Sequence, residues 1–311
     1  MAKQTGASPL TMRNVNGEYF LRLRDQQQAA TYRMISSVFS TDQPQEEYPW
    51  LAESPQLVKW EGERTIRKLK SDKITIVTDD YETGVAFRKR DFTRDKTAQM
   101  QARVQEMAFN VSVFPTQLVT DLIVANGNAY DGRAFFDGSH VVGDSGTIDN
   151  LVVAAELAGG TTPTTEQQAD NILVVLERLM GFKNASGQPL NEAAKQFVMM
   201  VPPNMYGRSV AAVNAAFTSA SATNPLSELR GMGINITVVL NARLPANDWY
   251  LFRVDAGIRP FIVQEEDTVP VELGVDSEHC QKTNEVYFGH GWSGGAGYGR
   301  FELACMADVV A

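Results

Sequence analysis

The stretch "DKTAQMQARVQEMAFNVSVFPTQLVTDLIVANG", residues 95–127, carries the strongest helical pattern of the chain. Its apolar residues recur three and four positions apart: Met100, Val104, Met107, Ala108, Val111, Leu118, Leu122 and Ile123. Asp95 or Thr97 can cap the start of this helix. Pro115 lies inside, where a proline costs about 3 kcal/mol and must kink or split the helix. We therefore predict one long bent helix, or two in tandem, over residues 95–126.

The segment before this helix reads as a hairpin. "RTIRKLK" (64–70) and "KITIVT" (73–78) alternate like strands, and "GVAFRKR" (84–90) follows an acidic turn around Asp79 and Asp80. An isolated two-stranded ribbon is marginal in water, and an arm of about 10 residues would reach ~33 Å. The hairpin could therefore lie on a neighbouring subunit, or be a surface hairpin of its own domain.

Residues 1–50 are polar and show little periodicity, with one short helix expected around Gln27–Ser37. Alone, such an arm cannot bury enough apolar surface to offset the entropy of ordering it. We expect that something else orders it, and a partner chain is a candidate.

A possible ligand cluster follows the helix, in "YDGRAFFDGSH" (130–140). Asp131, Asp137 and His140 could supply three metal ligands, but such ligands need fixed supporting partners, and no established metal-binding spacing is present. Asp-Gly pairs also form turns, which the two phenylalanines between them would anchor in the core. We favour the turn interpretation, with His140 as a polar partner in the loop.

Strands and helices alternate through the rest of the chain. We expect strands in 195–201, 234–240, 248–254 and 259–264, and helices around 172–180 and 205–217. The tail, "NEVYFGHGWSGGAGYGRFELACMADVV" (284–310), should form two strands around a glycine-rich turn. This order indicates an α+β fold with a central portion inserted between an early helix and a late returning strand.

The composition limits the classes of protein to which this chain can belong. The chain has 311 residues, 43% hydrophobic and 21% charged, with a net charge of −9 and an isoelectric point near 5.0. This is a globular composition, sufficient for one large domain or two modest ones. Its acidity argues against a dedicated nucleic-acid-binding role. No apolar run approaches the ~18 residues of a membrane span, and the N-terminus lacks the apolar core of a signal peptide.

Signatures of catalysis are missing from the sequence. Cys280 and Cys305 fit no metal or redox spacing, which favours a reduced, cytoplasmic origin. The glycines of "GWSGGAGYG" (291–299) precede no G-K-[ST], and no G-x-S-x-G occurs. We expect no enzyme activity, no cofactor and no metal.

Four blocks of sequence carry a resemblance to a known family. In order they are "YPWLAESPQLVKWEGERTI" (48–66), "DDYETG" (79–84), "YDGRAFFDGSH" (130–140) and "VYFGHGWSGGAGYG" (286–299). Together they resemble the major head subunit of Mu-like phages and prophages, the gpT family, over nearly the whole chain from about residue 10. Gly138, Ser139 and Val141 depart from the expected family pattern. This departure further weakens the interpretation of the 130–140 block as a metal site.

The resemblance implies the tailed-phage major capsid (HK-97-like) fold. Its parts would be an N-terminal arm (1–50), an E-loop region (51–92), a peripheral domain with the spine helix (93–194), an axial domain (195–280) and a return to the peripheral domain (281–311).

The implied function is a major capsid protein that self-assembles, as hexamers and pentamers, into an icosahedral shell around a phage genome. Implied partners are a scaffold, a portal, decoration proteins and packaged double-stranded DNA contacted non-specifically, with no membrane; the shell would assemble in the bacterial host cytoplasm and end in the virion. We predict assembly contacts from the charged residues of the hairpin: Arg64, Arg67, Lys68, Lys70, Lys73, Asp79, Asp80, Arg88, Lys89 and Arg90. The alternatives are an encapsulin-like nanocompartment shell, or a metal-dependent hydrolase that uses the three side chains of the 130–140 block.

Overall fold

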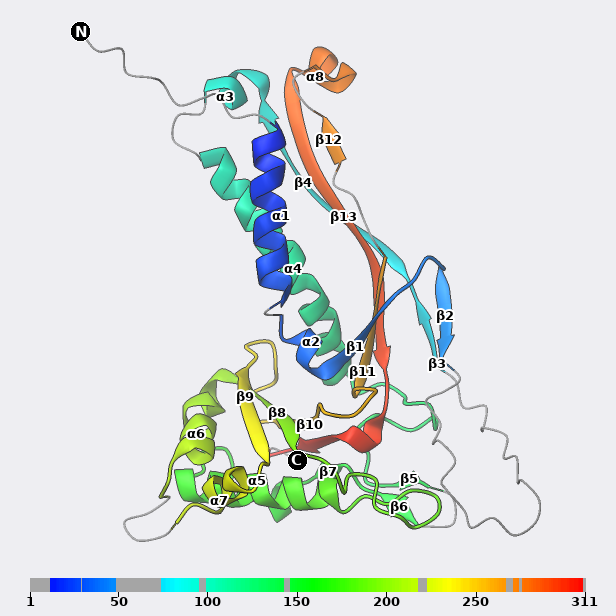
Figure 1. Cartoon of the computed structure of the whole chain (residues 1–311), viewed down its shortest axis with the longest axis vertical. Helices are drawn as coiled ribbons and strands as arrows, with labels where there is room; N and C mark the ends of the chain where they lie inside the picture. The colour runs from blue at the N-terminus through cyan, green and yellow to red at the C-terminus, as the bar shows by residue number, and fades with distance from the viewer. Residues whose placement is uncertain are drawn as a thin grey trace, which may run out of the picture.

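The computed structural model describes residues 12–28, 30–48, 74–94, 99–142, 146–217, 223–266, 271–273 and 276–309. The described chain is elongated, with two parts (Figure 1). In Figure 1 the upper part holds long helices beside a long ribbon of paired strands, and the lower part holds a second sheet with helices beside it. The fold is α+β, as predicted.

Helix α4 (Gln99–Ala125) is the axis of the molecule and confirms the predicted helix. It runs unbroken through Pro115, which is buried, so the helix is not split. Its upper half contributes to one apolar cluster through residues such as Val104, and its lower half to the main core through residues such as Ile123. One helix therefore joins both parts of the fold.

One described helix has the length and apolar composition of a membrane span, although no apolar run of that length was expected. The segment Ala102–Ala125, within α4, contains an 18-residue window with a mean hydropathy of 1.3. A core helix passes the same test, and α4 packs against α1 (Met12–Gln28) and strands β4 (Asp79–Arg88) and β13 (Glu285–Tyr298).

The N-terminal segment is more ordered than its composition suggested. Instead of one helix around Gln27–Ser37, the chain forms α1, then α2 (Tyr32–Ile35) and strand β1 (Ser36–Ser40). Tyr19 of α1 is fully buried in the upper cluster. The order of this segment therefore comes from packing within its own chain, because α1 lies along α4 (Figure 1).

The first sheet is built around β13 (Glu285–Tyr298), which pairs antiparallel with three strands. These strands are β4 (Asp79–Arg88), β11 (Phe261–Glu266) and β12 (Val271–Leu273), and β1 adds to β11 in parallel. The strands β4 and β13, called the ribbon below, are paired over all ten residues of β4.

The predicted glycine-rich turn in the tail was wrong. The glycines lie inside the continuous strand β13, where they permit close approach of a second layer. A Cβ atom on Gly295 would stand 2.2 Å from the carbonyl oxygen of Val77, and one on Gly297 would stand 2.6 Å from the Ile76 side chain. Strand β3 (Ile74–Val77), paired with β2 (Gln45–Tyr48), therefore lies against β13 where side chains are missing.

The predicted acidic turn was also wrong. Asp79 and Asp80 begin strand β4, opposite Gly294 and Ser293 of β13. Only Thr78 separates β3 from β4, so the chain changes its pairing partner there while staying extended. The strand expected at 64–70 lies outside the described residues.

The second sheet has the order β7-β14-β10-β8-β9. Its strands are β7 (Leu151–Val152), β8 (Gln196–Val201), β9 (Asn235–Leu240), β10 (Trp249–Arg253) and β14 (Ala304–Ala307). Helices α5 (Thr165–Met180), α6 (Pro203–Asn214) and α7 (Pro225–Gly231) lie beside it in the lower part of Figure 1. Thr164 begins α5 with a reciprocal capping box to Gln167, which explains the start of that helix.

Short elements complete the described chain: α3 (Lys89–Arg94), β5 (His140–Val141), β6 (Thr147–Ile148), η2 (Ala154–Glu156), α8 (Glu278–Thr283) and η3 (Phe301–Leu303). The predicted domain ranges do not follow the two sheets. Strands β11 and β12, within the expected axial range, belong to the first sheet, whereas β14, within the expected return, belongs to the second. The domain division itself stays a prediction.

Candidate assembly surface

The two faces of the ribbon differ in character. Along β4, exposed and half-buried residues alternate, as a strand covered on one face requires. Tyr81 and Phe87 are half-buried, and Phe87 packs against the upper cluster that α4 helps to form. Asp80, Glu82 and Arg88 are exposed on the opposite face. The ribbon thus buries one face within its own chain and presents charge on the other.

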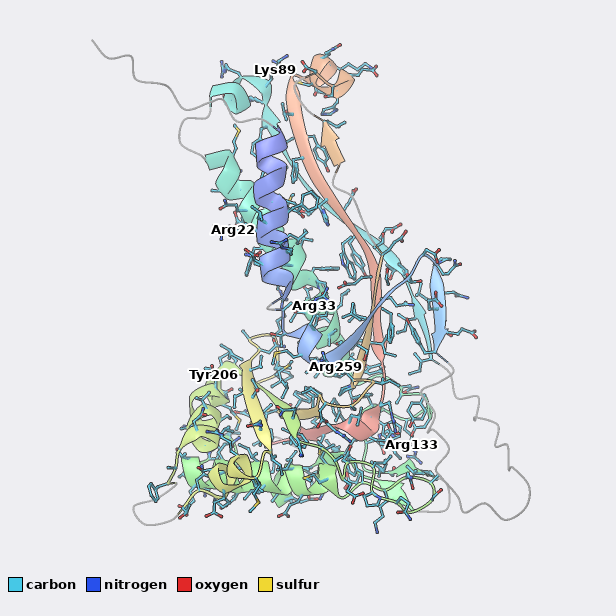
Figure 2. All side chains as sticks on the ribbon, in the orientation of Figure 1. Arg22, Arg33, Lys89, Arg133, Tyr206 and Arg259 are labelled. Atoms are coloured by element: carbon cyan, nitrogen blue, oxygen red, sulfur yellow. The ribbon has the colours of Figure 1, made fainter. Side chains whose placement is uncertain are left out.

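Five of the predicted contact residues fall on the ribbon or directly after it: Asp79, Asp80, Arg88, Lys89 and Arg90. The acidic pair begins β4, and the basic residues end it and open α3. In Figure 2 Lys89 lies at the far tip of the upper part. The other five lie outside the described residues: Arg64, Arg67, Lys68, Lys70 and Lys73.

Charged side chains on this face and at the start of α3 are largely exposed. Asp80 accepts a hydrogen bond from the Ser293 hydroxyl on the paired strand. Arg90 lies 3.7 Å from Asp91, but both side chains are more than half exposed, and such pairs contribute about 0–1 kcal/mol. These groups remain accessible to a partner.

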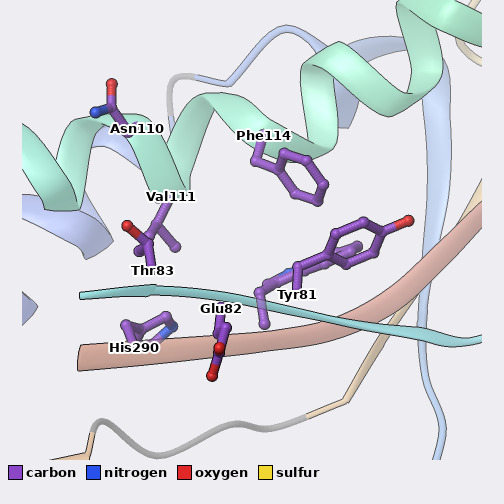
Figure 3. Close-up of a pocket in the computed structure, with 8 residues that line it drawn as sticks. Tyr81, Glu82, Thr83, Asn110, Val111, Phe114 and His290 are labelled. Atoms are coloured by element: carbon purple, nitrogen blue, oxygen red, sulfur yellow. The ribbon is translucent and has the colours of Figure 1, made fainter.

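A cavity of about 240 Å³ lies between α4 and the covered face of the ribbon (Figure 3). Its aromatic lining comes from both elements, and the ring of Tyr81 lies 4.5 Å from that of Phe114 and 5.7 Å from that of Trp292. Burial lowers the pKa of His290 and so favours the neutral form of its imidazole. The cavity is mainly apolar and suits packing rather than acid–base chemistry.

The 130–140 block forms the turn that was predicted. Asp137 Oδ1 accepts hydrogen bonds from the backbone nitrogen and the hydroxyl of Ser139, each at 2.7 Å. The hydrogen bond from the Ser139 hydroxyl is the main reason that the pKa of Asp137 lies below its usual value. Asp131 Oδ1 accepts from the Arg133 backbone nitrogen at 3.1 Å. Both aspartates therefore shape their own turns.

His140 is a core residue rather than an exposed loop residue. Its Nδ1 atom lies 2.6 Å from Asp131 Oδ2, and its ring stacks on Phe301 at 3.8 Å. Phe135 and Phe136 are 0% and 2% exposed, so they anchor the loop as expected. Within the described residues, no three His, Cys, Asp or Glu side chains group closely enough to hold a metal ion.

Sequence reasoning missed Asn150, which holds this loop in place. The side chain is fully buried; its Oδ1 accepts from the Asp137 nitrogen at 2.8 Å, and its Nδ2 donates to the carbonyl oxygens of Phe135 and Phe301. Asparagine is common in turns, so its type gave no signal of this role.

The waist between the two parts also depends on residues that the sequence did not single out. Tyr298 accepts a hydrogen bond from the Gly127 nitrogen at 2.5 Å and donates to the Leu122 carbonyl at 2.8 Å, which ties the end of β13 to the end of α4. Arg259 donates to the Arg33 carbonyl, and Figure 2 places both at this level.

Solved structures with this arrangement include phage capsids. The chain matches the mature capsid of bacteriophage PhiM1 with a TM-score of 0.58 at 14% identity, covering 90% of this chain and 86% of that one. It matches the procapsid of bacteriophage JBD30 with a TM-score of 0.54 at 19% identity, covering 97% and 76%. A virus-like particle from Pyrococcus furiosus also matches, with a TM-score of 0.52 at 9% identity, covering 94% and 98%. The fold is therefore that of the tailed-phage major capsid proteins, as predicted.

The sequence gives a more particular relationship. Residues 15–166 match the family described as "Mu-like prophage major head subunit gpT". The Mu-like prophage FluMu major head subunit of Haemophilus influenzae is 26% identical over 140 residues, 44% of this chain and 46% of that protein. The major capsid protein of Escherichia phage Mu is 30% identical over 113 residues, 36% and 37%. The resemblance to the gpT family is thereby confirmed, and the match spans less than half the length of these two relatives.

Proposed function

We propose that this chain is a major capsid protein that assembles into the shell of a Mu-like phage or prophage head. One observation carries the proposal: a capsid fold over most of the chain coincides with a gpT match over residues 15–166. The matched residues include most of α1, strands β3 and β4, helix α4 and the 130–140 turn.

The physical basis of assembly would be repeated contact between unlike surfaces. Such contacts close into rings when the rotation between subunits permits, and rings of five and six subunits can close a shell. Charged residues of the 64–90 segment would contribute to the contacts between subunits: Arg64, Arg67, Lys68, Lys70, Lys73, Asp79, Asp80, Arg88, Lys89 and Arg90. Exposed charges favour correct partners and orientation more than they add affinity.

Further partners belong to the same proposal. A JBD30 capsid of similar fold is decorated with minor capsid protein trimers, which supports a decoration partner here. A scaffold and a portal would take part in assembly in the host cytoplasm, and double-stranded DNA would fill the virion. The net charge of −9 suits a shell that contacts DNA non-specifically without holding it to the wall. No enzyme activity is proposed.

An encapsulin-like nanocompartment is the second candidate, because the similarity to a virus-like particle shows that this fold is not confined to phage heads. The matches in sequence favour the phage head, since both relatives are major head or capsid proteins. The contents of purified particles separate the two, because a phage head holds a genome and a nanocompartment holds an enzyme cargo.

Sedimentation velocity of the purified full-length chain tests the proposal. We expect species of five or six subunits and larger assemblies, with proportions that depend on protein and salt concentration. A monomer at every salt and protein concentration would contradict a shell-forming role.

A further inference from the structure

One edge of β4 is unpaired within the described part of the chain. Strand β13 occupies the other edge over Asp79–Arg88, and no described strand lies against the outer edge. A strand of ten residues is about 33 Å long, and its free edge presents a row of backbone donors and acceptors. Such an edge is a ready template for a strand from another chain.

The exposed side chains of β4 are arranged so that the strand complements itself. Asp80 and Glu82 lie near the beginning, Gly84 lies at the middle, and Arg88 ends the strand. All are exposed on the face that α4 does not cover. When two copies of such a strand run antiparallel, the acidic end of each lies opposite the basic end of the other.

We propose that the outer edge of β4 pairs antiparallel with the same edge of a second copy of this chain, about a two-fold axis at Gly84. Asp80 of each copy then lies directly opposite Arg88 of the other, and Glu82 lies opposite Ala86. Directly opposed side chains have Cβ atoms about 4.5–5.5 Å apart, within reach of an ion pair. The contact rests on the proposed function, which brings the second copy to this edge.

The register follows from the strand itself. Directly opposed residues must lie on the same face of the sheet, so the two-fold axis passes through a residue. Within Asp79–Arg88, only an axis at Thr83 or Gly84 gives the longest overlap between the two copies of β4. An axis at Thr83 puts Asp80 opposite Ala86 and leaves Arg88 beyond the overlap. An axis at Gly84 pairs both charged ends.

The second copy suits this edge better than an unrelated strand does. The contact has the same surface on both sides, which is the requirement of a two-fold interface. Gly84 places no side chain at the axis, and its own face is covered by the Tyr287 ring of β13, which a Cβ atom on Gly84 would meet at 2.2 Å. Arg88 makes no ion pair within the described residues, so it is available to a partner.

Charge reversal in the full-length chain tests the pairing. In the variant Asp80→Arg alone, or Arg88→Asp alone, positions 80 and 88 of the two copies carry like charges and face each other. We expect the protein concentration needed for assembly to rise about tenfold. Mixing the two variants restores opposite charges at both ends of the contact, so assembly should return toward that of the unchanged chain. Asp170→Arg and Arg243→Asp, at exposed positions away from β4, are matched controls that should assemble normally.

A cross-link tests the register. In the double variant Glu82→Cys with Ala86→Cys, the new thiols of two copies face each other, and mild oxidation of assembled protein should give a covalent dimer. The native Cys280 and Cys305 are 2% and 0% exposed and should not contribute. The same variant with Asp80→Arg added should lose most of the dimer.

Two results overturn the pairing while leaving the proposed function intact. One is normal assembly of both charge variants; the other is loss of assembly in each that mixing fails to restore, with unchanged circular dichroism and melting temperature. Failure of the unchanged chain to form any assembly would instead count against the proposed function.

Discussion

The buried His140 side chain pairs with Asp131, with Nδ1 of the histidine 2.6 Å from Oδ2 of the aspartate. His140 has no exposed surface, and its ring lies nearly parallel to that of Phe301. The pair therefore joins the loop after α4 to the segment between β13 and β14. Its place in the fold indicates a structural role.

The change His140→Ala should lower the free energy of unfolding by about 2–4 kcal/mol, because it leaves a cavity against Phe301 and removes the partner of Asp131 Oδ2. Urea unfolding of the purified chain measures the loss. His279→Ala, on the short helix α8, is the control and should change stability by less than about 0.5 kcal/mol. Equal, small effects of both changes would contradict a structural role.

Asn150→Ala should cost about 2–4 kcal/mol, since it removes the acceptor of the Asp137 nitrogen and a donor to the carbonyl oxygens of Phe135 and Phe301. Thermal unfolding gives the measurement. Asn110→Ala, at an exposed position of α4, should be nearly neutral. A stable Asn150→Ala protein would show that other groups can replace this hydrogen bonding.

Two glycines of β13 offer a matched comparison. Gly295→Ala forces a Cβ atom against the Val77 carbonyl and should destabilise the chain by about 1–3 kcal/mol. In Gly291→Ala the nearest atom stands 3.7 Å away, an ordinary contact, so stability should change little. Hydrogen exchange should show β3 loosened in the first variant alone. Similar behaviour of the two variants would contradict the close crossing of β3 and β13.

The raised pKa of Asp248 predicts that the stability of the fold depends on pH. Burial is the main cause that raises its pKa, and Asp308 adds to it, against a hydrogen bond from the Val309 nitrogen. Because the folded-state pKa is above the ordinary one, the folded chain binds this proton more tightly, and the carboxylate weakens the fold at pH 7. Asp248→Asn should therefore raise the melting temperature at pH 7.

The gain from Asp248→Asn should shrink as the pH falls through the raised pKa and vanish below the ordinary value near 4. Asp170→Asn, at an exposed site, should show no such trend. A gain that grows toward low pH would have the wrong sign for a buried carboxylate.

Periodicity predicted the helices and strands whose burial follows a simple pattern. Helix α4 could be predicted from the residues Met100 to Ile123, because one apolar stripe packs on the core over the length of the helix. In contrast, α1 has few apolar residues, and its order depends on α4 and the ribbon, which the local sequence cannot show.

The turns predicted in the glycine-rich and acidic stretches were wrong for a physical reason. Glycine often marks a turn, but in β13 it makes room for the crossing strand, which only tertiary packing reveals. Asp79 and Asp80 resemble a turn in isolation, yet pairing with β13 extends them. The candidate contact residues were chosen for charge; their order along one strand edge required the structure.

Electron microscopy of the purified full-length chain under assembly conditions tests the central claim most directly. A major capsid protein should give closed, icosahedral shells with rings of six and five subunits, and a map of the shell should place this fold in every position. Particles that remain single subunits over the full range of salt and protein concentration, or that form only open aggregates, would contradict the account.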